Sequence, residues 1–518
     1  MTTFDPRIRD ALALLPDYLG QHVILSVSAI LFGIVLGLPL AVASLRAPRL
    51  RFALLTIVGL IQTIPSLALL ALFYPLLLGL SLVTASFGLQ FSALGFLPSV
   101  IALTLYSMLP IIRNTLTGIS GIDPAIKQAA VGVGMTPLQS LLRVELPLAV
   151  PVIMAGIRTT AIWVIGTATL STPIGQTSLG NYIFTGLQTQ NWIFVLFGCV
   201  AAAALALIVD GLLGSVEFAL TNRSRKRLVL SAAAFAVVIG MSIISGFTHS
   251  ATQYVIGSKP FAEQYVLAAL LEQRLADAHL TAVERAGLGS TVAFDALVGG
   301  DIDAYVDYSG TIWTNYMHRT DFASREAILS EVERWLKDRG VTLLGPLGFE
   351  NAYALAMRRD KAMALGINTI GDLALRSSNL SMAGDLEFFS RPEWRALQRD
   401  YGIAFREQRT LQGTFMYRAV ADGEVDVISA YSSDGEIAQY DLVTLDDPKH
   451  SLPPYDALLL ISPRRAADKA FIDALRPLVG ALNVERMRRA NLAVGEQTGQ
   501  LTPAAAARAL WNDISPAQ

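Results

Sequence analysis

Charged residues are distributed very unevenly along this chain of 518 residues. No Lys, Arg, Asp or Glu occurs between Arg51 and Arg113, whereas the second half mixes charged, glycine and aromatic positions. A membrane-spanning helix needs roughly 20 mainly apolar residues. Six segments of the first half supply such runs, at residues 23–45, 52–78, 97–112, 148–170, 192–213 and 228–247. The pattern therefore predicts an all-α membrane domain of six helices.

The second half has the pattern of a water-soluble α/β domain. Short apolar strands are predicted at residues 304–308, 353–357, 425–430 and 457–461, and they alternate with helical stretches such as 264–276 and 325–337. About 265 residues exceed the usual size of a single domain. We therefore expect two lobes around a cleft, with the chain crossing between them near Met357 and Ala457.

The charge balance supports the same division. Residues 1–250 hold 13 Lys and Arg against 7 Asp and Glu, and the remaining residues hold 27 against 35, so the overall charge of −2 combines a positive half with a negative one. Three parts are predicted: a five-helix membrane domain at 1–222, a basic linker with the sixth helix at 223–251, and a soluble domain at 252–518. The single cysteine, Cys199, rules out a disulfide within the chain and is expected to be buried.

Positive residues in the short loops predict the orientation of the membrane helices. Cytoplasmic loops are enriched in Lys and Arg, and every second loop here carries them. These loops contain Arg46, Arg49 and Arg51, then Arg113, Lys127 and Arg143, then Arg223, Arg225, Lys226 and Arg227. The intervening loops, 79–96 and 171–191, contain none. The N-terminus and the soluble domain are therefore expected outside, with the sixth segment as an uncleaved anchor.

The positive loop at residues 113–147 carries an ordered set of small and helix-starting residues. These are Gln128, Ala129, Ala130, Gly134, Leu146 and Pro147. Small residues allow a short helix to pack closely against a partner, glycine turns the chain, and Leu-Pro begins a new helix. The set resembles the coupling loop of ABC importer permeases, although an acidic residue is usual where Gln128 stands. The resemblance implies that this loop contacts a separate cytoplasmic ATPase.

Two further segments narrow the resemblance to one family. The sequence resembles permeases of the osmoprotectant importers for betaine, choline and carnitine at residues 61–70 and 106–115. The first of these segments includes Gln62, Thr63 and Ser66. Polar side chains inside a membrane span are expected where helices line a path or bond to one another. The resemblance implies a type I importer permease that works as a homodimer with a pair of ATPase subunits.

The soluble half resembles the substrate-binding protein of the same family, which has a type II periplasmic-binding fold. The matching motifs lie in family order at residues 257–264, 300–311, 351–355, 429–434 and 453–455. Family members hold quaternary ammonium groups between aromatic rings, because such groups have no N–H to donate and are attracted to ring faces. The matching positions here are Tyr308, Tyr353, Tyr431 and Tyr455.

Polar residues at other family positions are candidates for the remainder of the substrate. Gln264, Thr311 and Asn351 match ligand-contact positions, and Lys259 matches the lysine of one branch of the family. Arg391 is a candidate to hold a substrate carboxylate through paired hydrogen bonds. Ala262 replaces a common hydroxyl residue, and some members have Asp where Asn351 stands.

Several other functions are disfavoured by the sequence. No phosphate-binding Gly-x-x-x-x-Gly-Lys-Ser/Thr loop, zinc-protease spacing or nucleophile elbow occurs, and the five histidines are scattered. We therefore expect a transport subunit without enzymatic activity, cofactor, metal or nucleic-acid partner. The expected function is import of a quaternary ammonium compound such as glycine betaine, choline or carnitine. The alternatives are ergothioneine import, because fused permease–receptor members are associated with that betaine, and a ligand-gated sensor or channel; a tethered hydrolase is a distant third.

Overall fold

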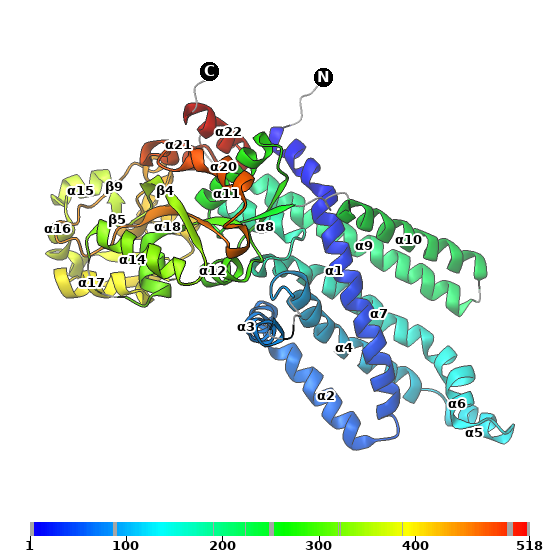
Figure 1. Cartoon of the computed structure of the whole chain (residues 1–518). Coiled ribbons are helices and arrows are strands. Elements are labelled where there is room, and N and C mark those ends of the chain that lie inside the picture. Colours follow the sequence, from blue (N-terminus) through cyan, green and yellow to red (C-terminus); the bar gives the residue numbers. More distant parts are fainter. Residues whose placement is uncertain are drawn as a thin grey trace. The chain divides into compact units, whose positions relative to one another are not determined.

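The computed structural model describes residues 5–85, 87, 91–189, 191–222, 224–247, 253–319, 321, 323–385, 387–494 and 501–514. The chain divides into two compact units, one comprising residues 1–183 and 194–250 and the other residues 184–193 and 251–518. The first unit is helical, and the second contains both β-sheets (Figure 1). The expected division into an all-α membrane domain and an α/β domain is therefore confirmed.

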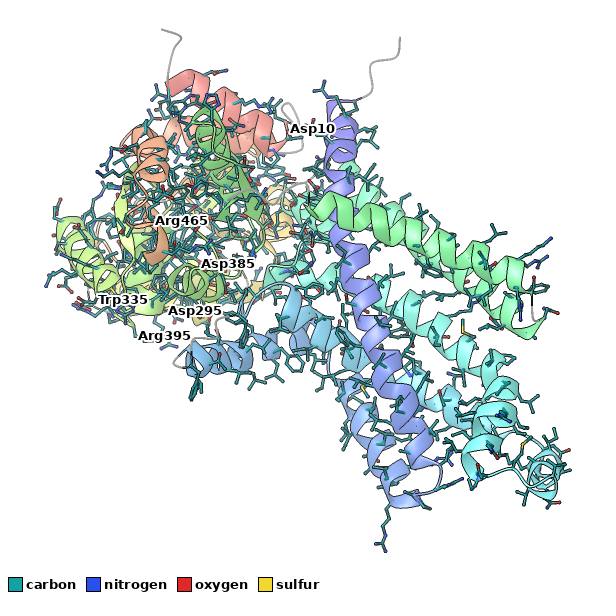
Figure 2. All side chains as sticks on the ribbon, turned by 45° about the vertical axis from the view of Figure 1, so that its right-hand side comes forward. Asp10, Asp295, Trp335, Asp385, Arg395 and Arg465 are labelled. Atoms are coloured by element: carbon teal, nitrogen blue, oxygen red, sulfur yellow. The ribbon has the colours of Figure 1, made fainter. Side chains whose placement is uncertain are left out.

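The first unit is built mainly from long apolar helices, whose side chains in Figure 2 are mostly hydrocarbon. In chain order the helices are α1 (Pro6–Ser44), α2 (Pro48–Thr63), α3 (Ser66–Ala85), α4 (Phe96–Ser120), α5 (Pro124–Gly132), α6 (Pro137–Ser140), α7 (Leu146–Ala168), α8 (Gly180–Gln188), α9 (Trp192–Thr221) and α10 (Arg225–Phe247). The end of α8, from residue 184, and the first two residues of α9 belong to the second unit. A π-helical turn, Leu141–Glu145, joins α6 to α7, and a 3-10 turn, Thr169–Ile174, follows α7.

Within the described residues, length and composition allow four helical stretches to cross a membrane. They are Arg7–Ser44, Phe96–Ser120, Pro137–Ile174 and Trp192–Thr221, and the bent pair of α2 and α3 is a candidate for a fifth crossing. Helix α10 contains the sixth predicted segment, whose role as a span remains a prediction. Helix α4 continues to Ser120, so Arg113 lies within a helix and not in the predicted loop.

The predicted span at residues 52–78 is not one straight helix. Helices α2 and α3 meet at an angle of 102°. Pro65 cannot donate a backbone hydrogen bond, and it disfavours helical geometry at the residue before it. Ile64 accordingly adopts an extended conformation, with φ of −73° and ψ of 128°.

Side chains from α2 and α4 bond across the bend. Pro110 removes the backbone donor that would otherwise reach the Tyr106 carbonyl within α4. Gln62 Nε2 donates to that carbonyl at 3.2 Å, and the Tyr106 hydroxyl donates in return to the Ile64 carbonyl. The Tyr106 carbonyl that Pro110 leaves open thus accepts from Gln62, and the carbonyl of the extended Ile64, between α2 and α3, accepts from Tyr106. Gln62 is engaged in interhelical bonding, one of the two roles expected for polar residues here.

The expectation that Cys199 is buried is wrong. It lies on an exposed face of α9, with Leu196 and Val200 also exposed beside it. An apolar run that crosses a membrane can face lipid as well as protein. Hydrophobic sequence around a cysteine therefore does not by itself place it in a protein core.

The second unit contains two five-stranded sheets. The first has the strand order β2-β1-β3-β10-β4 and the second β7-β6-β8-β5-β9. The first sheet consists of β1 (Tyr254–Gly257), β2 (Ala282–Arg285), β3 (Ala304–Tyr308), β4 (Thr342–Glu350) and β10 (Asp456–Ile461). The second consists of β5 (Tyr353–Arg358), β6 (Ser381–Gly384), β7 (Glu407–Thr410), β8 (Val427–Tyr431) and β9 (Leu442–Thr444). This is the two-lobed arrangement that the sequence predicts.

The chain crosses between the two sheets twice. The first crossing is at Asn351 and Ala352, between β4 and β5, and therefore precedes the predicted position at Met357, which lies inside β5. The second crossing lies between Thr444 and Asp456, next to Ala457 as predicted. Strand β10 pairs antiparallel with both β3 and β4, so the first sheet is completed only after the chain has passed through all five strands of the second sheet.

Helices flank both sheets of the second unit. They are α11 (Ala262–Asp277), α12 (Ser290–Gly299), α13 (Ser309–Thr311), α14 (Arg325–Lys337), α15 (Arg359–Leu365), α16 (Ile370–Ala374), α17 (Pro392–Tyr401), α18 (Gly413–Ala421), α19 (Glu436–Gln439), α20 (Lys469–Leu475), α21 (Val484–Val494) and α22 (Pro503–Ile514). Helix α11 is buried along much of its length and packs against α20, α21 and α22. The first turn of α11 and the middle of α21 both reach the cavity described next.

Candidate functional site

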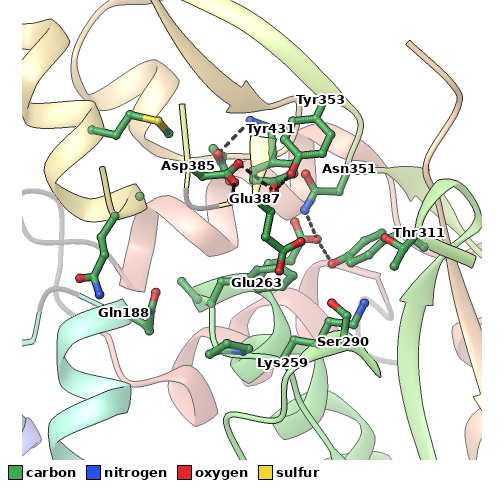
Figure 3. A pocket seen from close by; sticks show the side chains of 18 of the residues that line it. Gln188, Lys259, Glu263, Ser290, Thr311, Asn351, Tyr353, Asp385, Glu387 and Tyr431 are labelled. Atoms are coloured by element: carbon green, nitrogen blue, oxygen red, sulfur yellow. Dashed lines mark hydrogen bonds between the residues drawn. The ribbon is translucent and has the colours of Figure 1, made fainter. Parts of the chain in front are cut away.

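Residues from both sheets of the second unit surround a cavity of about 330 Å³ (Figure 3). Eight of the nine residues predicted for the substrate lie on its wall: Lys259, Tyr308, Thr311, Asn351, Tyr353, Arg391, Tyr431 and Tyr455. Gln264 is buried behind them, where Nε2 donates to the Tyr308 hydroxyl at 3.0 Å and to the Val306 carbonyl at 3.1 Å. The structure thus brings the predicted set together, while substrate contact by each member remains a prediction.

Three of the four tyrosines form one cluster. Tyr353 and Tyr431 lie opposite each other on β5 and β8, with ring centroids 4.5 Å apart. Tyr455, immediately before β10, meets the Tyr353 ring edge-on at 5.9 Å. The cluster therefore combines two rings from the second lobe with one from the first, and its ring faces provide an electron-rich surface.

The hydroxyl groups of this cluster are held in place. Tyr431 donates to the Tyr353 hydroxyl at 2.7 Å, and the Asp385 carboxylate lies 3.4 Å from the Tyr431 oxygen. Burial and the charge of Asp385 raise the pKa of Tyr431 well above its ordinary value. Both phenols therefore remain neutral at physiological pH, with fixed rings beside a carboxylate.

Tyr308 lies on the same cavity wall in a different setting. Its ring packs against Phe261 at 6.2 Å, and Lys259 Nζ lies 5.4 Å from the ring centroid. The hydroxyl donates to Glu263 Oε1 at 2.6 Å. Tyr308 thus contributes one ring to the cavity, and its orientation is fixed by the glutamate at the start of α11.

The two cations predicted to bind substrate are already paired with carboxylates. Lys259 is almost fully buried and donates to Asp307, whose other oxygen accepts from Tyr305 at 2.5 Å. Arg391 pairs with Glu387 at 3.1 Å and with Glu393 at 3.3 Å. A substrate carboxylate would therefore compete with acidic side chains for either cation.

Arg391 also connects the two lobes. It follows the second-lobe strand β6, and its Nη2 donates to the Tyr455 hydroxyl at 3.0 Å and to Thr314 Oγ1 at 3.4 Å in the first lobe. Tyr455 in turn donates to Glu393. The arginine therefore positions Tyr455 against the other two rings, a role that the sequence interpretation did not assign.

Acidic residues on the cavity wall were missed by the sequence interpretation. Glu263, Asp385, Glu387, Asp434 and Glu436 line the cavity, against two cations that are both paired. Burial raises the pKa of Asp434 well above its usual value, and the nearby Glu436 raises it further. Glu263 and Asp434 each had a signal in the sequence, because they lie in the segments 257–264 and 429–434 that match the family. The cavity is thus suited to a positively charged ligand.

No cluster of three or more His, Cys, Asp or Glu positioned for a metal ion is found within the described part of the chain. The carboxylates of the cavity instead accept hydrogen bonds from tyrosine and asparagine side chains. The chemistry that the site supports is recognition of an organic cation by rings and carboxylates.

Glycine at position 310 allows the close approach of Tyr455. A Cβ atom there would lie 2.5 Å from Cε2 and 2.6 Å from Cζ of that ring. We expect Gly310→Ala to displace Tyr455 and weaken ligand binding roughly tenfold, about 1.4 kcal/mol. Calorimetric titration would measure this loss. Gly299→Ala is the matched control, because a Cβ at Gly299 meets nothing within 4 Å; equal affinity of the two variants would contradict the expectation.

The predicted coupling residues lie within residues 124–147 of the first unit, called the coupling segment below, which begins with the short helix α5 and ends at the start of α7. Gln128 and Ala129 lie on the exposed side of α5, whereas Ala130 packs against its own chain. Gly134 adopts a left-handed conformation, with φ of +80°, where the chain turns after α5. Leu146 and Pro147 begin α7. The turn and the helix start thus lie where the sequence predicts them, and contact with an ATPase remains a prediction.

Apolar side chains are exposed on the same segment. Val131, Val133 and Leu138 are 68%, 74% and 63% exposed. Lys127 fixes the base of the segment, because Nζ donates to the Ile119 carbonyl at 2.9 Å and lies 3.6 Å from Glu145. A braced segment with several exposed apolar side chains is suited to contact with a partner protein.

Comparison with known proteins gives matches to both units. Residues 252–513 match the substrate-binding domain of ABC-type glycine betaine transport systems, and residues 29–227 match the inner membrane component of binding-protein-dependent transport systems. The ergothioneine transport permease/ergothioneine binding protein EgtU of Helicobacter pylori (strain G27) is 28% identical over 484 residues, covering 90% of this chain and 84% of that protein.

Two further similarities each cover one part of the chain. The choline transport system permease protein OpuBB of Bacillus subtilis (strain 168) is 41% identical over 208 residues, which are 40% of this chain and 89% of the relative. The crystal structure of a glycine betaine/carnitine/choline ABC transporter has 25% sequence identity and a TM-score of 0.45. It covers 51% of this chain and 98% of that one.

Proposed function

The chain belongs to the osmoprotectant family of ABC importers, as a permease fused to its substrate-binding domain, and we propose that its substrate is a quaternary ammonium compound. The cluster of Tyr353, Tyr431 and Tyr455 is the observation that carries this proposal. Ring faces attract a cation, and each contributes about 0.5–2 kcal/mol when water is excluded. Because a trimethylammonium group cannot donate N–H hydrogen bonds, it is better matched to ring faces than to the acceptors that an ordinary ammonium group needs.

The charge of the cavity supports the same substrate class. Asp385 adjoins the tyrosine cluster, and the cavity cations Lys259 and Arg391 are paired with carboxylates. A buried cation is stabilised by nearby negative charge that water does not screen. Glycine betaine, choline and carnitine are the proposed candidates within this class.

Ergothioneine is the second candidate. The relative from Helicobacter pylori that carries this substrate in its name aligns with 90% of the present chain, across both the permease and the binding domain. Ergothioneine also has a trimethylammonium group, so the same rings would bind it. Its thioimidazole would then lie in the part of the cavity away from the cluster.

A member of this family is a multi-pass protein of the inner membrane that works with an ATPase. We further propose that the domain from residue 252 onwards lies outside and that two copies of the chain form the permease. In this proposal the region before residue 252 comprises a five-helix permease at 1–222 and an anchor at 223–251. Alternation of positive loops supports the orientation, and the permease match favours transport over a ligand-gated sensor or channel.

The coupling segment is proposed to transmit ATP-driven movement. Residues Gln128, Ala129, Ala130, Gly134, Leu146 and Pro147 would place α5 against a cytoplasmic ATPase. The exposed Val131, Val133 and Leu138 support this role, because they present an apolar surface on a braced loop.

Calorimetric titration of the purified full-length chain tests the substrate class. The ligands are glycine betaine, choline, carnitine and ergothioneine, with ethanolamine as the matched control because it has the skeleton of choline and an ordinary ammonium group. We expect at least one quaternary compound to bind and ethanolamine to bind far more weakly. Equal affinity for choline and ethanolamine, or no binding of any quaternary compound, would refute the proposed class.

Affinity is expected to fall as the pH is lowered through the raised pKa of the Asp434 carboxyl. Burial raises the pKa of Asp434 above the ordinary range of a carboxyl, and the neighbouring Glu436 raises it further. Lowering the pH therefore adds protons to the cavity and removes negative charge, while a trimethylammonium group stays charged. Titrations at several pH values would measure the change. Asp434→Asn should reduce the dependence, and an affinity independent of pH in the native protein would contradict it.

A further inference from the structure

Three charged residues meet between two apolar helices of the first unit. Arg158 is the sole charged residue of α7, and Asp210 and Glu217 are the two charged residues of α9. Both helices belong to stretches that are long and apolar enough to cross a membrane. Charged side chains are costly inside a membrane, and they usually mark functional positions there. The three residues therefore call for a role beyond packing.

The guanidinium of Arg158 binds both carboxylates. Its Nε and Nη2 donate to the two oxygens of Asp210 at 2.8 Å each, and Nη1 donates to Glu217 Oε2 at 3.0 Å. Two parallel bonds to one carboxylate fix the direction of the contact as well as its length. The single charge of α7 thus engages both charges of α9. We call Arg158, Asp210 and Glu217 the ionic clamp.

The backbone of α9 leaves room for this contact. Asp210, Gly214 and Glu217 lie on one face of the helix, because four and then three residues separate them. A Cβ atom at Gly214 would lie 3.4 Å from Arg158 Cζ and 3.5 Å from Nη1. A longer side chain at this position would therefore displace the guanidinium. Glycine is unfavourable inside a helix, and here it allows the clamp to form.

The clamp lies where α9 meets the first half of α7. Leu213 and Val216 of α9 pack against an apolar cluster that includes Ile153 and Ile157 of α7. The opposite end of α9 contributes instead to a cluster with α1 and α8. Apolar packing gives little preference between helices in a membrane, because lipid tails are equally apolar. The charged contact therefore specifies how this end of α9 is held against α7.

Helix α7 also begins at the coupling segment (Figure 1). Glu145, directly before α7, accepts from Ser140 Oγ at 3.0 Å and lies 3.6 Å from Lys127 Nζ. From Leu146 the helix is continuous as far as Ala168. Rigid secondary-structure elements and ion-pair networks carry displacement from one site to another. Movement of the coupling segment therefore reaches Arg158 through a single helix.

We propose that the ionic clamp carries movement of the coupling segment from α7 to α9, with Arg158 as a positioning residue for the import cycle. The proposal rests on the proposed role of the coupling segment in ATP-driven transport. Without the clamp, ATP hydrolysis continues but α9 no longer follows α7. The expected defect therefore lies in the amount of substrate imported per ATP, and not in substrate binding.

Replacing the whole clamp with apolar residues tests this proposal. The variant combines Arg158→Met, Asp210→Leu and Glu217→Met, which leaves no charge unpaired; replacing a buried ion-pair set in this way usually preserves stability. Vesicles that contain the chain and its ATPase give the number of substrate molecules imported per ATP hydrolysed. The probe is whichever of glycine betaine, choline, carnitine and ergothioneine binds most tightly. We expect this ratio to fall about fivefold or more, with unchanged substrate affinity.

Exchanging the charges provides the matched control. Arg158→Glu combined with Asp210→Arg again places one cation between two carboxylates and keeps the net charge of the set. We expect this variant to recover about half of the native ratio or more, because the contact between α7 and α9 is restored. Size-exclusion chromatography in detergent checks the folding of both variants.

Two results would overturn the clamp. A native ratio in the apolar variant, even with both rates lowered, would show that the three charges only neutralise one another. A ratio in the exchange variant no better than in the apolar variant would show that the residues do not act by joining the helices. Val131→Asp with Val133→Asp, measured alongside, separates the two levels of inference. Normal uptake by that variant would overturn the proposed coupling segment, and the clamp with it.

Discussion

Replacing Tyr431 with alanine is expected to weaken binding of the quaternary ammonium substrate by about tenfold to a hundredfold, or about 1.4–2.8 kcal/mol. Two effects combine in this loss. The ring itself is removed from the cluster, and Tyr353 loses both a neighbouring ring at 4.5 Å and a hydrogen-bond partner at 2.7 Å. Tyr431→Ala thus disturbs two of the three rings.

Tyr431→Phe provides the matched control for this result. It keeps the ring and removes only the hydroxyl that bonds to Tyr353, so we expect it to lose less than about fivefold in affinity. Calorimetry on both full-length variants, with circular dichroism to check folding, separates ring loss from general damage. Affinity of Tyr431→Ala within about twofold of the native chain would place the ammonium group elsewhere.

The second large effect is expected in the coupling segment, where Val131→Asp combined with Val133→Asp should lower the uptake rate by about tenfold or more without changing substrate affinity. Both side chains are highly exposed, and charge would prevent them from entering an apolar partner surface. The segment would still fold, because Lys127 bonds to Ile119 and Glu145 at its base, away from these positions.

Two measurements with the same ligand check this prediction. One is the uptake rate of vesicles that contain the chain and its ATPase, and the other is the binding affinity of the chain. The double variant is expected to lose at least tenfold in uptake rate. Val131→Thr with Val133→Thr keeps the shape without adding charge and should retain most activity. Normal uptake by the aspartate variant would show that α5 and the turn after it do not contact the ATPase.

The sequence predicts well those features that depend on local composition. Apolar runs locate the helical unit, and alternating strands and helices indicate the two-lobed domain, because both patterns are read from neighbours in the chain. The bend between α2 and α3 is harder to predict, since no charged residue interrupts residues 52–78. Pro65 was the available signal, and its effect on Ile64 follows from backbone geometry.

The binding site is less accessible to sequence reasoning. Similarity to the family identifies the tyrosines, but only strand register shows that Tyr353 lies opposite Tyr431, 78 residues later. Pairing of Lys259 with Asp307 is equally invisible in the chain order. Acidic residues usually indicate solvent-exposed surface, so the burial of Glu263 becomes evident only when Asn351 and Asn491 are brought beside it.

Strand order also determines when this domain can be completed during synthesis. All five strands of the second sheet lie between residues 353 and 444, so that lobe is available as one continuous piece of chain. The first sheet has β10 between β3 and β4, and it must therefore wait for residues 456–461. A nascent chain interrupted before that point would present the edges of β3 and β4 unpaired, and unpaired strand edges promote aggregation. Integrity of the C-terminal region is thus a condition for maturation of the receptor.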